Sequence, residues 1–201
     1  MSATPIRALI GLGNPGLEYL RTRHNAGFWL VDALVAGART QFRSEVKFQG
    51  ELAKVSVGTH ELLVLKPSTY MNRSGEAVQK LAQFYKIAAQ EILVVHDELD
   101  LPPGVARLKS GGGHGGHNGL RSLHQHLGPD YLRLRIGVGH PGHKDQVHDY
   151  LTSGRPRKAE ETLILDSIAN ALQVLPVLFS QGLERAMLLL HSKPDAGATD
   201  E

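Results

Sequence analysis

The chain has 201 residues, of which 41% are hydrophobic and 21% charged, a composition typical of one folded globular domain. It contains no cysteine, which excludes disulfides, thiolate metal sites, iron–sulfur clusters and a cysteine nucleophile. The formal net charge is only +2, the N-terminal segment lacks the long apolar core of a signal peptide, and no run reaches the roughly 18 apolar residues of a membrane span. We therefore expect a cytoplasmic protein.

The charge is distributed unevenly along the chain. Residues 101–150 carry six Lys or Arg against three Asp, and they contain seven of the eleven histidines. The same segment holds six glycines within positions 111–119. This middle segment is therefore chemically distinct from the rest of the chain.

The first predicted element is a short buried strand over residues 6–12, which ends in the turn GNPG. A helix then begins at about Asn25, because apolar residues recur at helical spacing from Phe28 to Leu34. Two runs rich in β-forming residues, 47–57 and 61–67, predict a hairpin joined through Gly58, Thr59 and His60.

A helix is predicted from Ser74, its expected N-cap, to Tyr85. A strand within 91–100 follows, and its four consecutive apolar residues indicate that both faces are buried. The remaining elements are expected strands at 105–110 and 132–139, a helix starting near Asn118, and helical structure from Pro156 to His191 interrupted at Pro176 and Gly182. The order predicts one α/β domain over residues 1–191, followed by a polar tail, 192–201.

The glycine-rich opening turn invites comparison with a dinucleotide-binding motif, since Gly11, Gly13 and Gly16 have the bare spacing. Pro15, however, removes a backbone donor from the phosphate cradle, and several more residues precede the helix. The turn instead projects Asn14 and leads to His24, close to a helix N-terminus. The helix dipole there disfavours imidazolium, so we expect a neutral histidine, as a general base requires.

Carboxylates follow the buried strand at 91–100, where α/β folds place their ligand crevice. Asp97 is therefore a candidate to orient a histidine by accepting its Nδ1–H. Two other interpretations remain open: the acidic residues begin a turn before Pro102 and Pro103, or they bind a divalent metal together with His96.

The glycine-rich run 111–119 lies between a strand and a helix, next to several basic side chains. A glycine-rich loop, a helix N-terminus and basic residues together favour phosphate binding. The alternatives are a merely flexible loop and a metal site using His114 and His117. In the earlier loop, 66–72, Tyr70 and Met71 stand at a loop tip, where apolar side chains tend to contact ligands.

The chain has no G-x-S-x-G elbow and no H-E-x-x-H motif, so a covalent acyl-enzyme and a standard zinc hydrolase lack support. A neutral histidine, an aspartate, loop asparagines and a basic surface fit the attack of water on an ester. The histidine would remove the proton, the aspartate would stabilise imidazolium, and asparagine amides would donate to the oxyanion.

Five motifs, in order, resemble those of bacterial peptidyl-tRNA hydrolases: GLGNPG (11–16), RHNAGF (23–28), KPSTYMNRSG (66–75), HDELDLPPG (96–104) and GGGHGGHNGLRS (111–122). The resemblance extends from about residue 6 to residue 191. It implies an α/β fold with a central mixed sheet flanked by helices, and a monomer that uses neither metal nor cofactor. It also implies cleavage of the ester between a peptide and the terminal ribose of tRNA, which recycles tRNA from prematurely released peptidyl-tRNA.

The resemblance also implies roles for individual residues. His24 would be the base and Asp97 its partner, while Asn14, Asn72 and Asn118 would be the amides that orient substrate or water and steady the oxyanion. The positions that line the channel for the peptide and terminal adenosine would be Tyr19, Tyr70, Met71 and His117, and those that clamp the tRNA 5′ phosphate would be Lys109 and Arg135.

Two other function classes stay open at this point. An RNA-binding module without catalysis would use the basic loop with Tyr70 as a stacking surface, but it gives the histidine, aspartate and asparagines no shared purpose. A metal-dependent phosphoesterase would need the histidines and carboxylates to converge on an ion.

Overall fold

The computed structural model describes residues 4–192, so all but the first residue of the predicted tail lies outside the described residues. Within that range one mixed sheet has the strand order β2-β3-β4-β1-β5-β7-β6. Its strands are β1 (Ala8–Gly11), β2 (Arg43–Glu45), β3 (Gly50–Val57), β4 (His60–Pro67), β5 (Ile92–Glu98), β6 (Ala106–Ser110) and β7 (Leu132–Gly137). The helices are α1 (Ala26–Gly37), α2 (Ser74–Tyr85), α3 (Asn118–Leu127), α4 (Val147–Thr152), α5 (Lys158–Gln181) and α6 (Leu183–His191).

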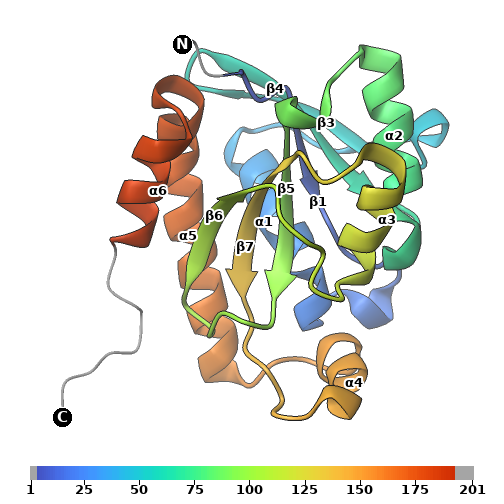
Figure 1. Cartoon of the computed structure of the whole chain (residues 1–201), viewed down its shortest axis with the longest axis vertical. Coiled ribbons are helices and arrows are strands. Elements are labelled where there is room, and N and C mark those ends of the chain that lie inside the picture. The colour runs from blue at the N-terminus through green and yellow to red at the C-terminus, as the bar shows by residue number, and fades with distance from the viewer. Residues whose placement is uncertain (1–3, 193–201) are drawn as a thin grey trace.

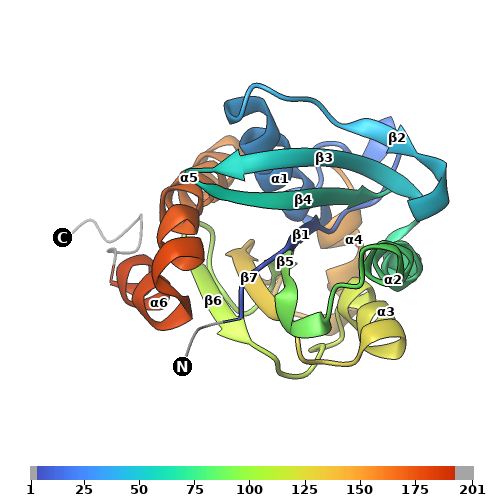
Figure 2. The same ribbon diagram turned by 90° about the horizontal axis from the view of Figure 1, so that it is seen from above.

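Helices cover both faces of the sheet, which confirms the predicted α/β class (Figures 1 and 2). Helices α1, α5 and α6 lie on one face of the sheet, and α2 and α3 lie on the other (Figure 2). Each face has one cluster of buried apolar side chains between its helices and the sheet. Strand β1 is central and parallel to both β4 and β5, and its apolar side chains are buried on both faces. Since β5 is also parallel to β7, the carboxyl ends of these strands meet at one edge, beside α4 (Figure 1).

Most predicted elements are present, with corrections at their boundaries. The strand expected from residue 47 begins at Gly50, because Val46–Phe48 form a 3₁₀ turn that ends with Gln49 in the left-handed region. Ser74 is the first residue of α2 and not its N-cap, and its hydroxyl donates to the carbonyl of Met71 at 2.7 Å. The sequence interpretation missed β2 and α4, both of which are short.

Helix α5 differs most from expectation, because it continues through Pro176 to Gln181. The helix has 24 residues and contains an 18-residue window with a mean hydropathy of 1.6. By length and composition alone it could cross a membrane, whereas the sequence interpretation found no segment apolar enough to do so. In the fold its apolar face packs on the sheet through buried residues such as Ile164, Ile168 and Leu175. Burial along one face is typical of an amphipathic helix that packs on a folded domain.

Candidate active site

His24 and Asp97 meet at the carboxyl edge of the sheet. His24 lies in the 3₁₀ turn Arg23–Asn25, directly before α1, and Asp97 lies near the end of β5. The Nδ1 of His24 is 2.8 Å from Oδ2 of Asp97, and the two residues are only 6% and 2% exposed. Because a carboxylate can only accept, Nδ1 carries the proton and donates it, which leaves Nε2 with a lone pair.

A second histidine shares the same carboxylate. The Nε2 of His117 donates to the other oxygen of Asp97 at 2.8 Å. On its opposite side, Nδ1 of His117 accepts the backbone N–H groups of Gly119 and Leu120, so His117 is the N-cap of α3. Both ring nitrogens are therefore occupied, and the tautomer is fixed. The sequence placed His117 along the substrate channel but gave no sign that it supports Asp97.

The charges in this cluster depend on one another. Burial opposes ionisation of Asp97, but the nearby His24 and His117 and their hydrogen bonds hold its pKa well below the usual range. Burial also opposes protonation of His24, yet the charge of Asp97 and its hydrogen bond outweigh that effect and raise the pKa of His24. The expectation that the helix dipole would set the state of His24 is therefore wrong, because a carboxylate in direct contact acts more strongly.

Asn14 is joined through Asn25 to the turn that carries His24 and has a defined orientation. Its Oδ1 accepts the backbone N–H of Met71 at 2.8 Å. Its backbone N–H and carbonyl are both paired with the side chain of Asn25, at 2.8 and 3.0 Å. The Nδ2 group of Asn14 donates to no described residue and is the donor left for a ligand.

The other two predicted amides are more exposed. Asn118 is the first residue of α3, and its Oδ1 accepts from Arg121 at 3.2 Å, which leaves its amide nitrogen available. Asn72 lies next to Met71 in a 3₁₀ turn and is exposed.

Tyr19 and Tyr70 are in edge-to-face contact, with ring centroids 6.5 Å apart, and Tyr70 is 57% exposed. The prediction that Met71 is an exposed residue of a loop tip is wrong, since its side chain is buried at 4% exposure in the core under α3. The backbone N–H of Met71 donates to Oδ1 of Asn14 and thereby orients that amide.

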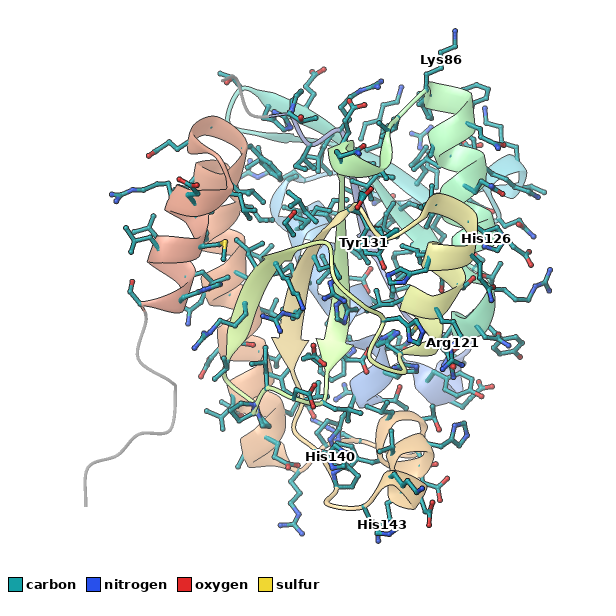
Figure 3. The ribbon with its side chains drawn as sticks, in the orientation of Figure 1. Lys86, Arg121, His126, Tyr131, His140 and His143 are labelled. Atoms are coloured by element: carbon teal, nitrogen blue, oxygen red, sulfur yellow. The ribbon has the colours of Figure 1, made fainter. Side chains whose placement is uncertain are left out.

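A cavity of about 590 Å³ connects the His24 and Asp97 pair to the basic segment. It is lined by the glycine-rich run, by α4, and by Lys109, Arg133 and Arg135 from β6 and β7. Further histidines lie around it: His140 lines its wall, and Figure 3 shows His140 and His143 on the segment between β7 and α4. The predicted basic surface therefore opens onto the predicted catalytic pair.

Arg133 holds the glycine-rich run against the basic wall. It is 3% exposed, and its Nη1 donates to the carbonyl of Gly113 at 2.8 Å. Gly112 has a φ of +99°, and a Cβ there would stand 2.9 Å from both Nζ of Lys109 and Nη2 of Arg133. The positive φ at this position favours glycine, and the backbone there lies close to the cationic ends of Lys109 and Arg133. The sequence interpretation included Arg133 in the basic wall but did not assign it to the site.

Two metal sites remained open from the sequence, one on His96 with the neighbouring carboxylates and one on His114 with His117. Within the described residues, neither set forms a group of three or more ligand atoms that could hold an ion. Within residues 4–192 the group that could hold a metal ion is His24, Asp97 and His117, whose ligand atoms lie within 4.8 Å of one another. Their hydrogen bonds to each other already use those atoms. His96 donates Nδ1–H to the backbone carbonyl of Asp97, and burial together with His117 lowers the pKa of His96 to about 3. His114 accepts the N–H of Gly116 through its Nδ1 and lies against the ring of His124.

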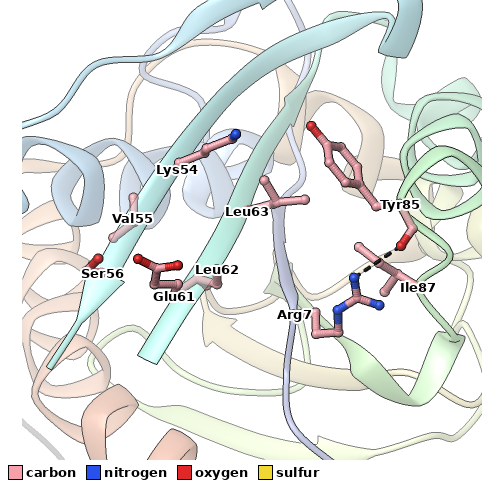
Figure 4. Close-up of a pocket in the computed structure, with 9 residues that line it drawn as sticks. All are labelled: Arg7, Lys54, Val55, Ser56, Glu61, Leu62, Leu63, Tyr85 and Ile87. Atoms are coloured by element: carbon pink, nitrogen blue, oxygen red, sulfur yellow. Dashed lines mark hydrogen bonds between the residues drawn. The ribbon is translucent and has the colours of Figure 1, made fainter. Parts of the chain in front are cut away.

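A second cavity, of about 340 Å³, lies at the opposite edge of the sheet (Figure 4). Its lining includes Arg7, Lys54, Glu61 and Tyr85. The guanidinium of Arg7 is already engaged, since it donates to the backbone carbonyls of Tyr85 and Lys86. This cavity has no histidine in its lining and does not connect with the predicted site residues.

The chain is similar to known proteins over most of its length. Residues 8–197 match the family model described as peptidyl-tRNA hydrolase. The chain is 53% identical over 189 residues to the peptidyl-tRNA hydrolase of Chromohalobacter salexigens, covering 93% of this chain and 97% of the relative. It is 50% identical over 189 residues to that of Neisseria gonorrhoeae, covering 94% and 98%. A crystal structure of peptidyl-tRNA hydrolase from Acinetobacter baumannii superposes with a TM-score of 0.91 at 44% identity, covering 95% of this chain and 97% of the other.

Proposed function

The chain belongs to the peptidyl-tRNA hydrolase family, and from that membership we propose that His24 and Asp97 activate the water with which it hydrolyses its substrate. The enzyme is an esterase that cleaves the bond between a peptide and the 3′-terminal ribose of tRNA. The observation that carries the residue assignment is the buried chain from His24 through Asp97 to His117, which leaves Nε2 of His24 as the free basic atom.

The reaction follows from this geometry. Nε2 of His24 takes a proton from water while the water oxygen attacks the ester carbonyl. The charge of Asp97 stabilises the imidazolium that forms, and this imidazolium then gives its proton to the departing ribose oxygen. The products are a peptide carboxylate and a tRNA with a free terminal hydroxyl.

The amides supply the donors for the developing oxyanion. Asn14 suits this role, because its Oδ1 is held by Met71 and only Nδ2 remains to donate. Asn118 and Asn72 have exposed side-chain amides and would orient the water and the substrate. A neutral amide donates without adding a charge that would bind the ground state equally well.

The residues around the catalytic pair would bind the tRNA 5′ phosphate, the peptide and the terminal adenosine of the substrate. Lys109 and Arg135 would hold the tRNA 5′ phosphate on the basic wall, which lies in the same cavity as His24. Tyr19, Tyr70, Met71 and His117 would border the path of the peptide and terminal adenosine.

The remaining assignments concern the whole protein. We place the enzyme in the cytoplasm as a monomer, with residues 1–191 as its catalytic domain and residues 192–201 as a tail. The relatives named above are bacterial proteins that the chain matches over nearly its whole length.

The test is hydrolysis of an N-acetylaminoacyl-tRNA by the purified protein in the presence of EDTA. His24→Ala should lower kcat by about 10²–10⁴-fold while tRNA binding is retained. The control is His143→Ala, which removes an exposed histidine outside the cavity lining and should leave kcat unchanged. Near wild-type activity of His24→Ala would refute the base assignment. Binding without turnover by the wild type would support an RNA-binding module, and loss of activity in EDTA would support a metal-dependent enzyme.

A further inference from the structure

Asn25 occupies the N-cap position of α1 but does not cap the helix. An asparagine at this position ordinarily accepts a backbone N–H from the first helical turn. Here the whole side-chain amide is directed to the residue eleven positions earlier, and Asn25 is 2% exposed. A buried polar side chain that gives up its local partner has a different task in the structure.

That task is a two-point hydrogen bond to the backbone of Asn14. The Oδ1 of Asn25 accepts the N–H of Asn14 at 2.8 Å, and its Nδ2 donates to the carbonyl of Asn14 at 3.0 Å. Both backbone polar groups of Asn14 are therefore fixed by one side chain. Because Oδ1 of Asn14 is also held by Met71, three hydrogen bonds determine where its Nδ2 lies.

These two hydrogen bonds, which we call the Asn25 clamp, also connect Asn14 to the turn that carries the base, His24. Asn25 follows His24 directly within the same 3₁₀ turn, so the side chain of Asn25 links the segment carrying the base to the segment carrying the oxyanion donor. Their relative position matters for the rate, because donors must meet the oxyanion at hydrogen-bond distance while the base meets the water.

We propose that Asn25 is a positioning residue, which sets the amide of Asn14 relative to His24; this inference rests on the proposed function. Asparagine is the side chain with the required length that both accepts and donates. Aspartate has the same shape and can still accept the N–H of Asn14. It cannot donate, however, and it places an oxygen against the Asn14 carbonyl. Asn25→Asp therefore breaks one of the two hydrogen bonds with little change in volume.

The test is a double-mutant cycle between Asn25→Asp and Asn14→Ala, with kcat and KM measured on N-acetylaminoacyl-tRNA. In the wild-type background Asn25→Asp should lower kcat by about 10–100-fold and change KM less than about threefold. In the Asn14→Ala background the same substitution should cost less than about threefold, because the donor it positions is gone. The carboxylate that Asn25→Asp adds near His24 is present in both backgrounds. Its direct effect on His24 therefore cancels when the loss of kcat in one background is compared with the loss in the other.

The matched control is Asn170→Asp, the same chemical change on α5 outside the cavity lining, and it should leave kcat unchanged. An equal loss from Asn25→Asp in both backgrounds would overturn the positioning role, as would no loss in the wild-type background.

A measurement on the wild-type protein covers the case in which Asn25→Asp does not fold. A long-range HNCO spectrum should show a coupling across the hydrogen bond from the backbone nitrogen of Asn14 to Cγ of Asn25. Absence of that coupling would overturn the clamp. If the wild type fails to hydrolyse the substrate, the proposed function fails, whereas the spectrum still decides whether the clamp exists.

Discussion

Asp97 holds a negative charge almost entirely out of solvent, and two imidazoles make this possible. One donates to each carboxylate oxygen at 2.8 Å. A buried carboxylate without partners would instead take up a proton, because burial strongly disfavours the charged form. The same contact raises the pKa of His24, so the base is stronger than an isolated histidine but is neutral only above that raised pKa.

This arrangement predicts a pH dependence. In the wild type, kcat/KM should fall as the pH drops through the raised pKa of His24, since protonation removes the base. Asp97→Asn removes the attracting charge, so the midpoint of this fall should move to lower pH, and kcat should drop by about 10²–10⁴-fold. A pH–rate profile between about pH 5 and 9 measures both effects. An unchanged midpoint would mean that Asp97 does not control the ionisation of His24.

At the scale of elements, the site depends on how closely helix α1 approaches the sheet. A Cβ on Gly27 would lie 2.4 Å from the carbonyl oxygen of Val95 in β5 and 2.6 Å from that of Leu12. Such contacts are with backbone and cannot be relieved by a rotamer change. Gly27 therefore permits the start of α1, and with it His24 and Asn25, to sit against the ends of β1 and β5.

Gly27→Ala tests this close approach. Helix propensity alone would favour alanine by up to about 1 kcal/mol. The contacts should outweigh this term, so we expect the free energy of unfolding to fall by roughly 1–3 kcal/mol in urea denaturation. Gly37→Ala, at the other end of the same helix, meets nothing within 4 Å and should be neutral or stabilising. Equal behaviour of the two variants would contradict the packing argument.

Arg23 joins the turn that carries the base to helices α4 and α5. Its Nη2 donates to Glu160 on α5 at 2.9 Å, its Nη1 donates to the carbonyl of Tyr150 on α4 at 3.2 Å, and its guanidinium lies 3.9 Å over the ring of Tyr150. Lysine can keep the charge but not the planar two-sided contact.

Arg23→Lys should therefore lower the free energy of unfolding by about 1 kcal/mol, since it leaves partly buried acceptors on Tyr150 and Glu160 without a well-placed donor. Thermal and urea unfolding measure the change. The comparison is Arg73→Lys, because Arg73 pairs with Glu76 on the surface, where exchanging the cation should have little effect. Full stability of Arg23→Lys would show that the link to α4 and α5 is dispensable.

At the scale of the whole molecule, the near-zero net charge conceals two different edges of one sheet. The cavity at the carboxyl edge combines the catalytic cluster with Lys109, Arg133 and Arg135. The cavity at the opposite edge has Lys54 and Arg7 in its lining together with the acidic Glu61. A polyanion should therefore bind over the first edge and not over the second.

The salt dependence of tRNA binding tests this division. Lys109→Ala and Arg135→Ala should each weaken binding and lower the slope of log Kd against log salt by about 0.7–0.9, because one phosphate contact is lost. Lys54→Ala removes an exposed cation at the opposite edge and should leave the slope unchanged. If all three variants keep the wild-type slope, Lys109 and Arg135 do not contact phosphate.

The pairing of His24 with Asp97 was implied by the resemblance to the family. The sequence by itself determined the α/β class, most helices and strands, and the five family motifs. These features are local, because they depend on side-chain periodicity, on turn residues such as Gly13 and Pro15, and on short motifs. The helix predicted over Ser74–Tyr85 is present with those bounds for this reason.

Only the tertiary structure decided which partners complete the site. His117 meets Asp97 from 20 positions away, Asn14 receives the N–H of Met71 from 57 away, and Arg133 reaches Gly113 from 20 away. Nothing in the local pattern distinguishes the non-capping Asn25 from an ordinary N-cap. The raised pKa of His24 has the same origin, since it results from a carboxylate 73 positions away that folding brings within 2.8 Å. Hydrogen bonds and charges act over a few ångströms in space, and the fold alone sets which residues come that close.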